Sequence, residues 1–303
     1  MIQHLLTGKE IDRPAMERLF DLTAALKAGR GSAHAPKPLA GKSIGVIFAK
    51  SSTRTRVSFE VGIHELGGQP VILDAGKTQM GRGESIPDTA RVLSRYLHGI
   101  VIRTFKQSDV EDLARWGSVP VINALTDDFH PCQALCDLFT IFEKKGGFDG
   151  VKMTYLGDGA SNMANSLMIA CKVAGMHMEI CAPEEFQPDE AIMNDPIGTG
   201  TVGWSTDPAR ALRDADFIYT DVWVSMGFEE EAARRFRILK PYQLNWQLLG
   251  MAKPDVKVMH CLPAHRGEEI TDDVMDSEHA IVFDEAENRL HVQKAIMATL
   301  MGS

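Results

Sequence analysis

The chain alternates short apolar runs with longer amphipathic runs over most of its 303 residues, and this alternation constrains the fold more than any other feature. Each short run is typical of a buried strand, and the runs between them have helical periodicity. Strands that alternate with helices in this way indicate parallel sheets covered by helices. The sequence therefore predicts an α/β fold with two doubly wound parallel-sheet domains joined by interdomain helices.

The expected elements fall into two halves. In the first half we expect strands at 43–49, 69–73, 99–102 and 120–123, and helices at 13–28, 53–66, 85–97 and 110–116. In the second half we expect strands at 152–156, 177–181, 201–204, 217–220, 256–261 and 280–283. Helix 131–145 is expected to join the halves, and helix 291–301 to return to the first. The predicted domains are residues 1–133 plus 290–303, and residues 134–289, with a cleft between the lobes.

The segment Ser52-Thr53-Arg54-Thr55-Arg56 directly follows the first expected strand of the sheet. A strand that ends in hydroxyl residues and enters a helix presents unbonded backbone N–H groups and a positive dipole end to an anion. An arginine adds a planar fork that binds two oxygens of a phosphate or carboxylate. Arg54 and Arg56 lie about 200° apart on a helix, so we assign the ligand role to Arg54. The alternative is a capped helix with two surface arginines.

Other polar side chains follow later strand ends in the first half. Arg103 ends the run 99–102 and adds a cation to the same edge of the sheet. His130 and Gln133 share one face of the next helix because they lie three residues apart. This pair suits a carbonyl group with an attached amine. The alternatives are an exposed strand-end arginine and a structural histidine.

The second half repeats the strand-end pattern with different chemistry. The run 157–162 resembles a dinucleotide fingerprint but has Asn162 where the third glycine is required, which disfavours pyrophosphate and suits a carboxylate or amine. Asp221 and Ser225 follow another strand and can receive an ammonium group. The turn that contains Ser225 is rich in small residues and can move as a lid.

A thiol ends a further expected strand, in His260-Cys261-Leu262-Pro263. Cys261 is either an inert buried thiol or a group polarised by His260 and Asp221. The charged run 284–289 is typical of a solvated face, and only Arg289 within it is a site candidate. His260 and His265 have no third ligand at a diagnostic spacing, so no metal is expected.

Composition excludes several classes of partner and compartment. A formal net charge of −9 disfavours nucleic acid and anionic membranes, which both reward a basic face. Five scattered cysteines without a CxxC pair favour a reducing cytosol over a disulfide framework. The first residues lack the apolar core of a signal peptide, and no apolar run is long enough to span a bilayer.

Together, the motifs at 52–56, 103, 130–133, 221–227 and 260–263 resemble those of the aspartate/ornithine carbamoyltransferase family over nearly the whole chain. The first and third motifs are shared by both branches of the family, whereas the last two resemble the ornithine branch. The resemblance implies transfer of a carbamoyl group from carbamoyl phosphate to L-ornithine, giving L-citrulline and phosphate without a cofactor. It also implies a homotrimer, or a multiple of one, with sites at subunit boundaries, and the cysteine usage above makes a cytoplasmic location the expectation. Arginine biosynthesis is favoured over breakdown.

The resemblance implies roles residue by residue. The carbamoyl phosphate contacts would be Ser52, Thr53, Arg54, Thr55, Gln79, Arg103, His130, Gln133, Cys261, Leu262 and Arg289. Gln79 is expected to serve an adjacent subunit's site. The ornithine contacts would be Asn162, Asp221, Ser225 and Met226, and the catalytic set Arg54, Arg103, His130, Cys261 and Asp221. One departure is Ala160-Ser161 beside Asn162, where relatives commonly have a second asparagine.

Three alternatives stay open at this point. One is a carbamoyltransferase with another acceptor, such as putrescine, an acylated ornithine or aspartate. Aspartate is disfavoured because its second carboxylate calls for additional basic residues, whereas the acceptor segment presents Asp221 and Ser225. The second is a non-catalytic sensor of a phosphorylated metabolite, and the third is a nicotinamide dehydrogenase.

Overall fold

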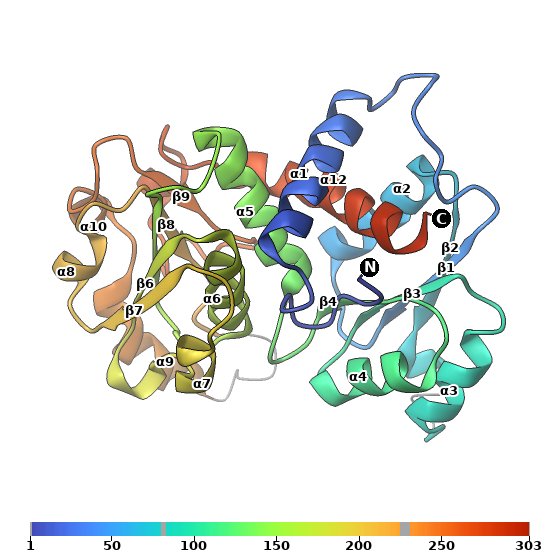
Figure 1. Ribbon diagram of the computed structural model, residues 1–303. Helices are drawn as coiled ribbons and strands as arrows, with labels where there is room; N and C mark the ends of the chain where they lie inside the picture. The colour runs from blue at the N-terminus through green and yellow to red at the C-terminus, as the bar shows by residue number, and fades with distance from the viewer. Residues whose placement is uncertain (1, 80–82, 225–230, 303) are drawn as a thin grey trace. The chain divides into compact units, whose positions relative to one another are not determined.

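The computed structural model describes residues 2–79, 83–224 and 231–302, which form two compact units. The first unit contains Met1–Phe139 and Glu287–Ser303, and the second contains Thr140–Ala286. The chain passes between the units within helix α5 (Pro131–Lys145) and within helix α12 (Val282–Met301) (Figure 1). The domain limits expected from the sequence, at 133/134 and 289/290, fall inside the same two helices and stay a prediction.

The first unit is built on four parallel strands in the order β2-β1-β3-β4. Its strands are β1 (Ser43–Phe48), β2 (Gln69–Asp74), β3 (Gly99–Arg103) and β4 (Val121–Leu125). Its helices besides α5 and α12 are α1 (Arg13–Ala28), α2 (Thr53–Glu65), η1 (Ala75–Lys77), α3 (Ile86–Leu93) and α4 (Gln107–Trp116). The four strands predicted for this half are all present.

The second unit is built on five parallel strands in the order β7-β6-β5-β8-β9. Its strands are β5 (Lys152–Leu156), β6 (His177–Cys181), β7 (Thr201–Ser205), β8 (Phe217–Thr220) and β9 (Lys257–Met259). Its helices are α6 (Asn162–Ala174), η3 (Glu184–Phe186), α7 (Glu190–Asn194), α8 (Pro208–Leu212), α9 (Ala232–Leu239), η5 (Lys240–Tyr242), α10 (Trp246–Leu249) and α11 (Asp272–Met275). The predicted α/β class with two parallel sheets is confirmed.

Serine side chains cap the starts of helices α2 and α6. Ser52 precedes α2 with an extended backbone, and its hydroxyl accepts a hydrogen bond from the N–H of Thr55 at 3.3 Å. Ser161 caps α6 in the same way, accepting from Ala164 at 3.1 Å. Such a cap satisfies one of the otherwise unbonded N–H groups and fixes where the helix starts.

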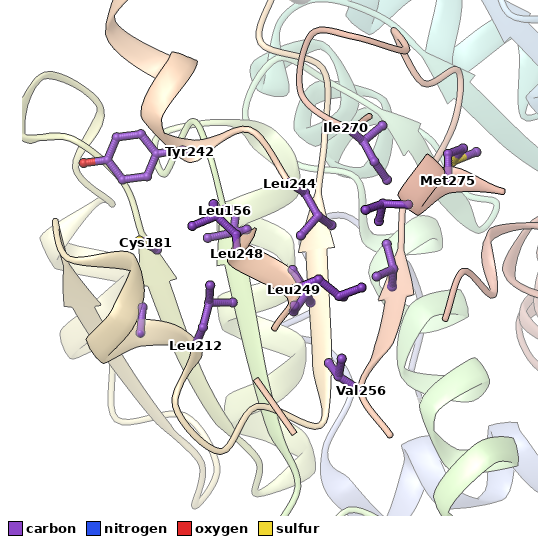
Figure 2. Close-up of a cluster of buried hydrophobic side chains, with 14 of the residues drawn as sticks. Leu156, Cys181, Leu212, Tyr242, Leu244, Leu248, Leu249, Val256, Ile270 and Met275 are labelled. Atoms are coloured by element: carbon purple, nitrogen blue, oxygen red, sulfur yellow. The ribbon is translucent and has the colours of Figure 1, made fainter. Parts of the chain in front are cut away.

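Aliphatic side chains from neighbouring strands form the core that supports the second sheet. Leu156, Ile218 and Val258 come from β5, β8 and β9 and belong to one buried cluster. Figure 2 shows Leu156 in that cluster together with Leu212, Leu244, Leu248, Leu249 and Ile270. Burial of each such side chain stabilises the fold by about 1.5–3 kcal/mol relative to exposure. The strand ends at this sheet are therefore held by a well-packed core.

The expected strand at 280–283 is wrong. Ala280 forms only an isolated parallel bridge with Val258, and helix α12 already begins at Val282. The acidic pair Asp284 and Glu285 lies in the first turn of this helix, where the helix dipole favours negative charge. The helix therefore starts well before residue 291, where the sequence pattern predicted it.

The same helix corrects the interpretation of the charged run as a solvated face. Glu285, Asn288 and Arg289 are all buried, whereas Asp284 and Glu287 are exposed. Residues three and four apart share a face of a helix, so some members of a charged run can point inward while others face the solvent.

Among the described residues, no helix has the length and apolar character needed to cross a membrane.

Candidate active site

The start of helix α2 is the anion-binding element of the first unit. Ser52 caps the helix, Thr53 and Arg54 are exposed in its first turn, and Thr55 is buried. Arg56 is also exposed and pairs with Glu60 at 2.7 Å, one turn further along the helix. Arg56 is therefore engaged along the helix surface, while Arg54 stays at the end where the helix dipole attracts an anion.

The strands β1, β3 and β4 are neighbours in the sheet, so their carboxyl ends lie along one edge. The register pairs Phe48 with Arg103, and the N–H of Ala49 donates to the carbonyl of Arg103 at 2.8 Å. Arg103 ends β3, and His130 lies between β4 and helix α5. Parallel pairing thus places the segment that enters α2, Arg103 and His130 on the same edge, as the sequence predicted.

Lys50 ties three of these strand ends together, and sequence reasoning did not identify it. Its side chain is 5% exposed, forms an ion pair with Asp127 after β4, and lies 4.5 Å from the ring centroid of Phe105 after β3. A lysine directly before a hydroxyl-rich helix start was the available signal. Its partners come from distant sequence positions, so only the fold reveals its supporting role.

Arg289 links helix α12 to the other elements of this edge. Its guanidinium donates to Gln133 Oε1 on α5 and to Thr55 Oγ1 on α2, the latter at 3.4 Å. Gln133 in turn donates through Nε2 to Asp137 Oδ1 at 2.6 Å. A carboxylate only accepts and a guanidinium only donates, so both partners direct the carboxamide oxygen of Gln133 towards Arg289. Asp137 is a second residue that the sequence did not single out.

His130 and Cys132 differ in their chemical roles although they lie in one motif. Burial lowers the pKa of His130 well below its ordinary value, and the nearby charges of Arg289 and Arg103 lower it further. His130 is therefore a neutral imidazole at physiological pH. Burial raises the pKa of Cys132 to about 12, and its thiol donates to the carbonyl of Asn123 at 3.3 Å. Cys132 is a structural thiol.

In the second unit, Asp221 and Cys261 come together from different strand ends. Asp221 follows β8 and Cys261 follows β9, and the thiol Sγ lies 3.1 Å from Asp221 Oδ1 with the thiol as donor. Asp221 is buried, and Cys261 is partly exposed. The structure therefore brings together the carboxylate and the thiol that the sequence proposed as a pair.

Asn162 is the first residue of helix α6, directly after the cap Ser161. The hydroxyl of Tyr155 lies 2.9 Å from Ser161 Oγ, which supports the start of the helix from beneath. Asn162 thus occupies a helix N-terminus at the carboxyl end of β5. This position suits a carboxylate group of a substrate.

Asp158 precedes that helix but is committed to a structural ion pair. Its carboxylate contacts the guanidinium of the buried Arg235. Arg235 also donates through Nε to the carbonyl of Trp223 at 2.6 Å, and its guanidinium lies 4.5 Å from the ring centroid of Phe186. Burial raises the pKa of Asp158 in spite of this cation. The pair fixes the loop after β5 to the segments around Trp223 and helix α9.

His260 supports the turn that follows β9. Its side chain is fully buried, with Nε2 lying 2.9 Å from Glu269 Oε1 and Nδ1 accepting from the N–H of Leu262 at 2.9 Å. Leu262 has a positive φ of 57°, and the Leu262–Pro263 peptide bond is cis. Leu262 and Cys261 are therefore presented by a turn whose backbone is bonded to a buried imidazole.

Among the residues of the second unit that the structure describes, two groups of side chains have a geometry that a metal ion can use. One is Asp221, His260 and Cys261, and the other is His265, Glu268 and Glu269; in each, one ligand atom per residue lies within 4.8 Å of the others. Both ring nitrogens of His260 already have hydrogen-bond partners, so ligation through His260 requires one of these bonds to break. The geometry favours a hydrogen-bonded turn at the first group.

The remaining predicted site residues are Gln79, Ser225 and Met226. Gln79 is exposed and follows η1. Ser225 and Met226 lie outside the described residues. Their expected contacts with carbamoyl phosphate and ornithine stay predictions.

Family models match both halves of the chain. Residues 3–143 match the model described as the aspartate/ornithine carbamoyltransferase carbamoyl-P binding domain, and residues 149–300 match the Asp/Orn binding domain of the same family. The two matches cover nearly the whole chain. Residues 144–148 lie between the two matches, at the end of helix α5 and directly after it.

Individual relatives match over their full length. A protein named ornithine carbamoyltransferase from Geobacter metallireducens is 49% identical, with coverage of 99% of this chain and 100% of that protein. A protein of the same name from Thermococcus kodakarensis is 50% identical, with coverage of 98% and 96%. A solved structure of ornithine carbamoyltransferase from Pyrococcus furiosus superposes with a TM-score of 0.94 at 47% identity, covering 100% of this chain and 98% of that one.

The environment of His130 leads to a pH prediction. Since its pKa in the folded protein is lowered, the folded chain stays unprotonated at His130 while the unfolded chain takes up a proton below pH 6.5. The free energy of unfolding is therefore expected to fall as the pH drops from 6.5 towards the folded pKa. In the His130→Asn variant, which lacks the imidazole, the free energy of unfolding measured by urea titration should fall less over the same pH range. Ring nitrogen shifts of His130 that titrate near pH 6.5 in the folded protein would contradict the prediction.

Proposed function

Because the chain belongs to the aspartate/ornithine carbamoyltransferase family, we propose that it transfers the carbamoyl group of carbamoyl phosphate to the side-chain amine of L-ornithine. The products are L-citrulline and inorganic phosphate. The observation that carries the proposal is the edge of the first sheet, where the capped start of α2, Arg103 and His130 lie together. The acceptor is inferred from the full-length relatives named ornithine carbamoyltransferase.

The phosphate group of the donor is assigned to the start of helix α2. Ser52, Thr53 and Thr55 offer hydroxyl and backbone donors there, and Arg54 adds a cation in the first turn. Charge builds up on the phosphate as the carbon–oxygen bond to the carbamoyl carbon breaks. Preorganised donors at a helix start stabilise this charge without reorganisation at the moment of reaction.

The carbamoyl group is assigned to the neighbouring strand ends. Arg103 and the neutral imidazole of His130 polarise its oxygen as negative charge develops in the tetrahedral intermediate. We assign Gln133 to the NH2 group, because its carboxamide oxygen, oriented by Asp137 and Arg289, has a second lone pair that can accept an N–H of the substrate. Arg289 acts in this scheme mainly by orienting Gln133 and Thr55.

The acceptor amine must lose a proton before its lone pair can attack the carbamoyl carbon. We assign ornithine to Asn162, Asp221, Ser225 and Met226, with Cys261 and Leu262 beside the reacting groups. In the hydrogen bond between Asp221 and Cys261 the carboxylate accepts, so Asp221 carries the negative charge that attracts the ammonium group. Asp221 and Cys261 are the two candidates for receiving the proton. Orientation and electrostatics suffice for this reaction because the donor is already activated.

The biological setting is also part of the proposal. We propose a homotrimer, or a multiple of one, that works in the cytoplasm in arginine biosynthesis. A reducing compartment fits the five free cysteines, of which four are buried. A trimer with Gln79 serving a neighbouring subunit fits the exposed position of Gln79 after η1.

The function is tested by offering the purified protein several amines together with carbamoyl phosphate. Phosphate release and a ureido product are expected with L-ornithine and not with aspartate, putrescine or N-acetylornithine at equal concentration. The proposed site gives a separate reason for each: aspartate brings a second carboxylate towards the acidic Asp221, putrescine lacks the carboxylate that suits the start of α6, and N-acetylornithine lacks the α-ammonium group. Product with another amine but not with ornithine would overturn the acceptor. Tight binding of carbamoyl phosphate without release of phosphate for any amine would indicate a sensor.

The anion assignment is tested by the pair Arg54→Gln and Arg56→Gln. The first removes the cation at the helix start and is expected to lower kcat/KM at least about 100-fold. The second removes only the surface pair with Glu60 and is expected to keep nearly parental activity. Circular dichroism checks that both variants fold. An Arg54→Gln variant that retains parental turnover would reject the phosphate role of this residue.

The trimer and the role of Gln79 are tested by mixing two inactive variants. Light scattering of the parent is expected to give about 100 kDa, three copies of the 33.3 kDa chain. Arg54→Gln and Gln79→Ala chains that are unfolded, mixed equally and refolded should recover about a quarter of parental activity, because hybrid trimers contain complete sites. In the control, Arg54→Gln chains are mixed with Arg103→Gln chains. Both residues belong to the same sheet edge of a single chain, so no hybrid trimer contains a complete site. Equal recovery in both mixtures would contradict a shared site.

A further inference from the structure

A buried histidine and a buried glutamate lie beneath the turn Cys261-Leu262-Pro263 of the second unit. His260 and Glu269 are both fully buried, and His260 Nε2 lies 2.9 Å from Glu269 Oε1. The same carboxylate oxygen accepts the backbone N–H of His265 at 2.6 Å, and Glu285 Oε2 accepts the N–H of His260 at 3.0 Å. Two carboxylates from the chain beyond β9 thus hold the residue that directly follows this strand.

The hydrogen bonds fix which nitrogen of His260 carries the proton. The N–H of Leu262 points at Nδ1 at 2.9 Å, so Nδ1 must offer a lone pair. The single ring proton is therefore on Nε2, where it is donated to Glu269. A second proton on the ring would place two donors face to face at Nδ1. Glu269 thus selects the one tautomer that can accept from Leu262.

This bond acts on a strained and chemically important part of the chain. Leu262 has a φ of 57°, in the left-handed region that a branched residue adopts only when its surroundings impose it. Cys261 directly precedes it, and its thiol donates to Asp221 at 3.1 Å. The bond between Leu262 and His260 therefore bears on both the Leu262 backbone and the position of the Cys261 thiol.

We propose that His260 is a positioning residue for carbamoyl transfer, held in its Nε2–H tautomer by Glu269. Through Nδ1 it keeps Leu262 in the left-handed conformation and keeps the Cys261 thiol against Asp221. His260 is fully buried, and it acts through the turn rather than on a substrate. The kinetic part of this proposal rests on the proposed function, whereas the structural part does not.

Amide substitutions separate the two nitrogens of His260. The side-chain oxygen of asparagine falls near the position of Nδ1, so His260→Asn retains an acceptor for Leu262. Glutamine reaches the position of Nε2 instead, and His260→Leu removes both bonds. We expect kcat to fall about 100-fold in His260→Gln and His260→Leu, and no more than about tenfold in His260→Asn. Glu269→Gln and Glu269→Leu test the role of the carboxylate without changing the imidazole. Glu269→Gln retains an acceptor oxygen and should keep nearly parental turnover, whereas Glu269→Leu lacks an acceptor and should have a lower turnover.

Alkylation of Cys261 by iodoacetamide gives a readout that is independent of turnover. Cys132, Cys136, Cys171 and Cys181 are buried, so mass mapping assigns the fast label to Cys261. The rate of Cys261 alkylation is expected to rise several-fold in His260→Gln, His260→Leu and Glu269→Leu. It is expected to stay near the parental rate in His260→Asn and Glu269→Gln. Equal turnover and equal labelling among the three His260 variants would overturn the proposal. A parent that labels as expected but forms no citrulline would instead reject the proposed function.

Discussion

The parallel pairing of β1, β3 and β4 is the constraint on which the rest of the first unit depends. It brings the start of α2, Arg103 and His130 to one edge of the sheet, although about 80 residues of sequence separate the first from the last. Concentrating cations at a buried edge has an electrostatic cost. Burial is the largest cause of the lowered pKa of His130, and the charges of Arg289 and Arg103, which lower it further, are part of this cost. An anionic donor offsets the same repulsion, so the edge favours a ligand with more than one negative charge.

Much of this arrangement could be predicted from the sequence because its cause is local. Apolar runs define the strands, and Ser52 and Ser161 define where two helices begin. The partners of Lys50 and Gln133 could not be predicted, since Asp127, Phe105 and Arg289 reach them only through the order of the strands and the path of α12. The mistaken strand at 280–283 has a related cause. An apolar run of four residues fits a strand or the buried face of a helix equally well, and tertiary packing decides.

The two units use one architectural device for opposite chemistry. In each, a parallel strand ends in a capped helix start, at Ser52 before α2 and at Ser161 before α6. The first unit surrounds that position with arginines, whereas the second supplies Asp221 with a thiol that donates to it. In the proposed assignment, the negatively charged donor and the positively charged acceptor would each meet side chains of opposite charge. The repeated backbone geometry provides the sites, and the side chains at the strand ends determine which substrate each one suits.

Two buried histidines illustrate how different surroundings fix the protonation of one side chain. His130 is kept neutral by burial and by two neighbouring cations, so an anion bound at the proposed site would change the charges that act on it. His260 instead has its single proton located by a backbone donor at Nδ1 and a carboxylate at Nε2, which are both parts of the fold. In the proposed function the first arrangement would respond to the ligand, whereas the second would hold the turn in place whether or not a ligand is bound. A reaction that builds charge on one substrate needs the responsive group beside that charge, and it needs the rigid group where geometry alone must be kept.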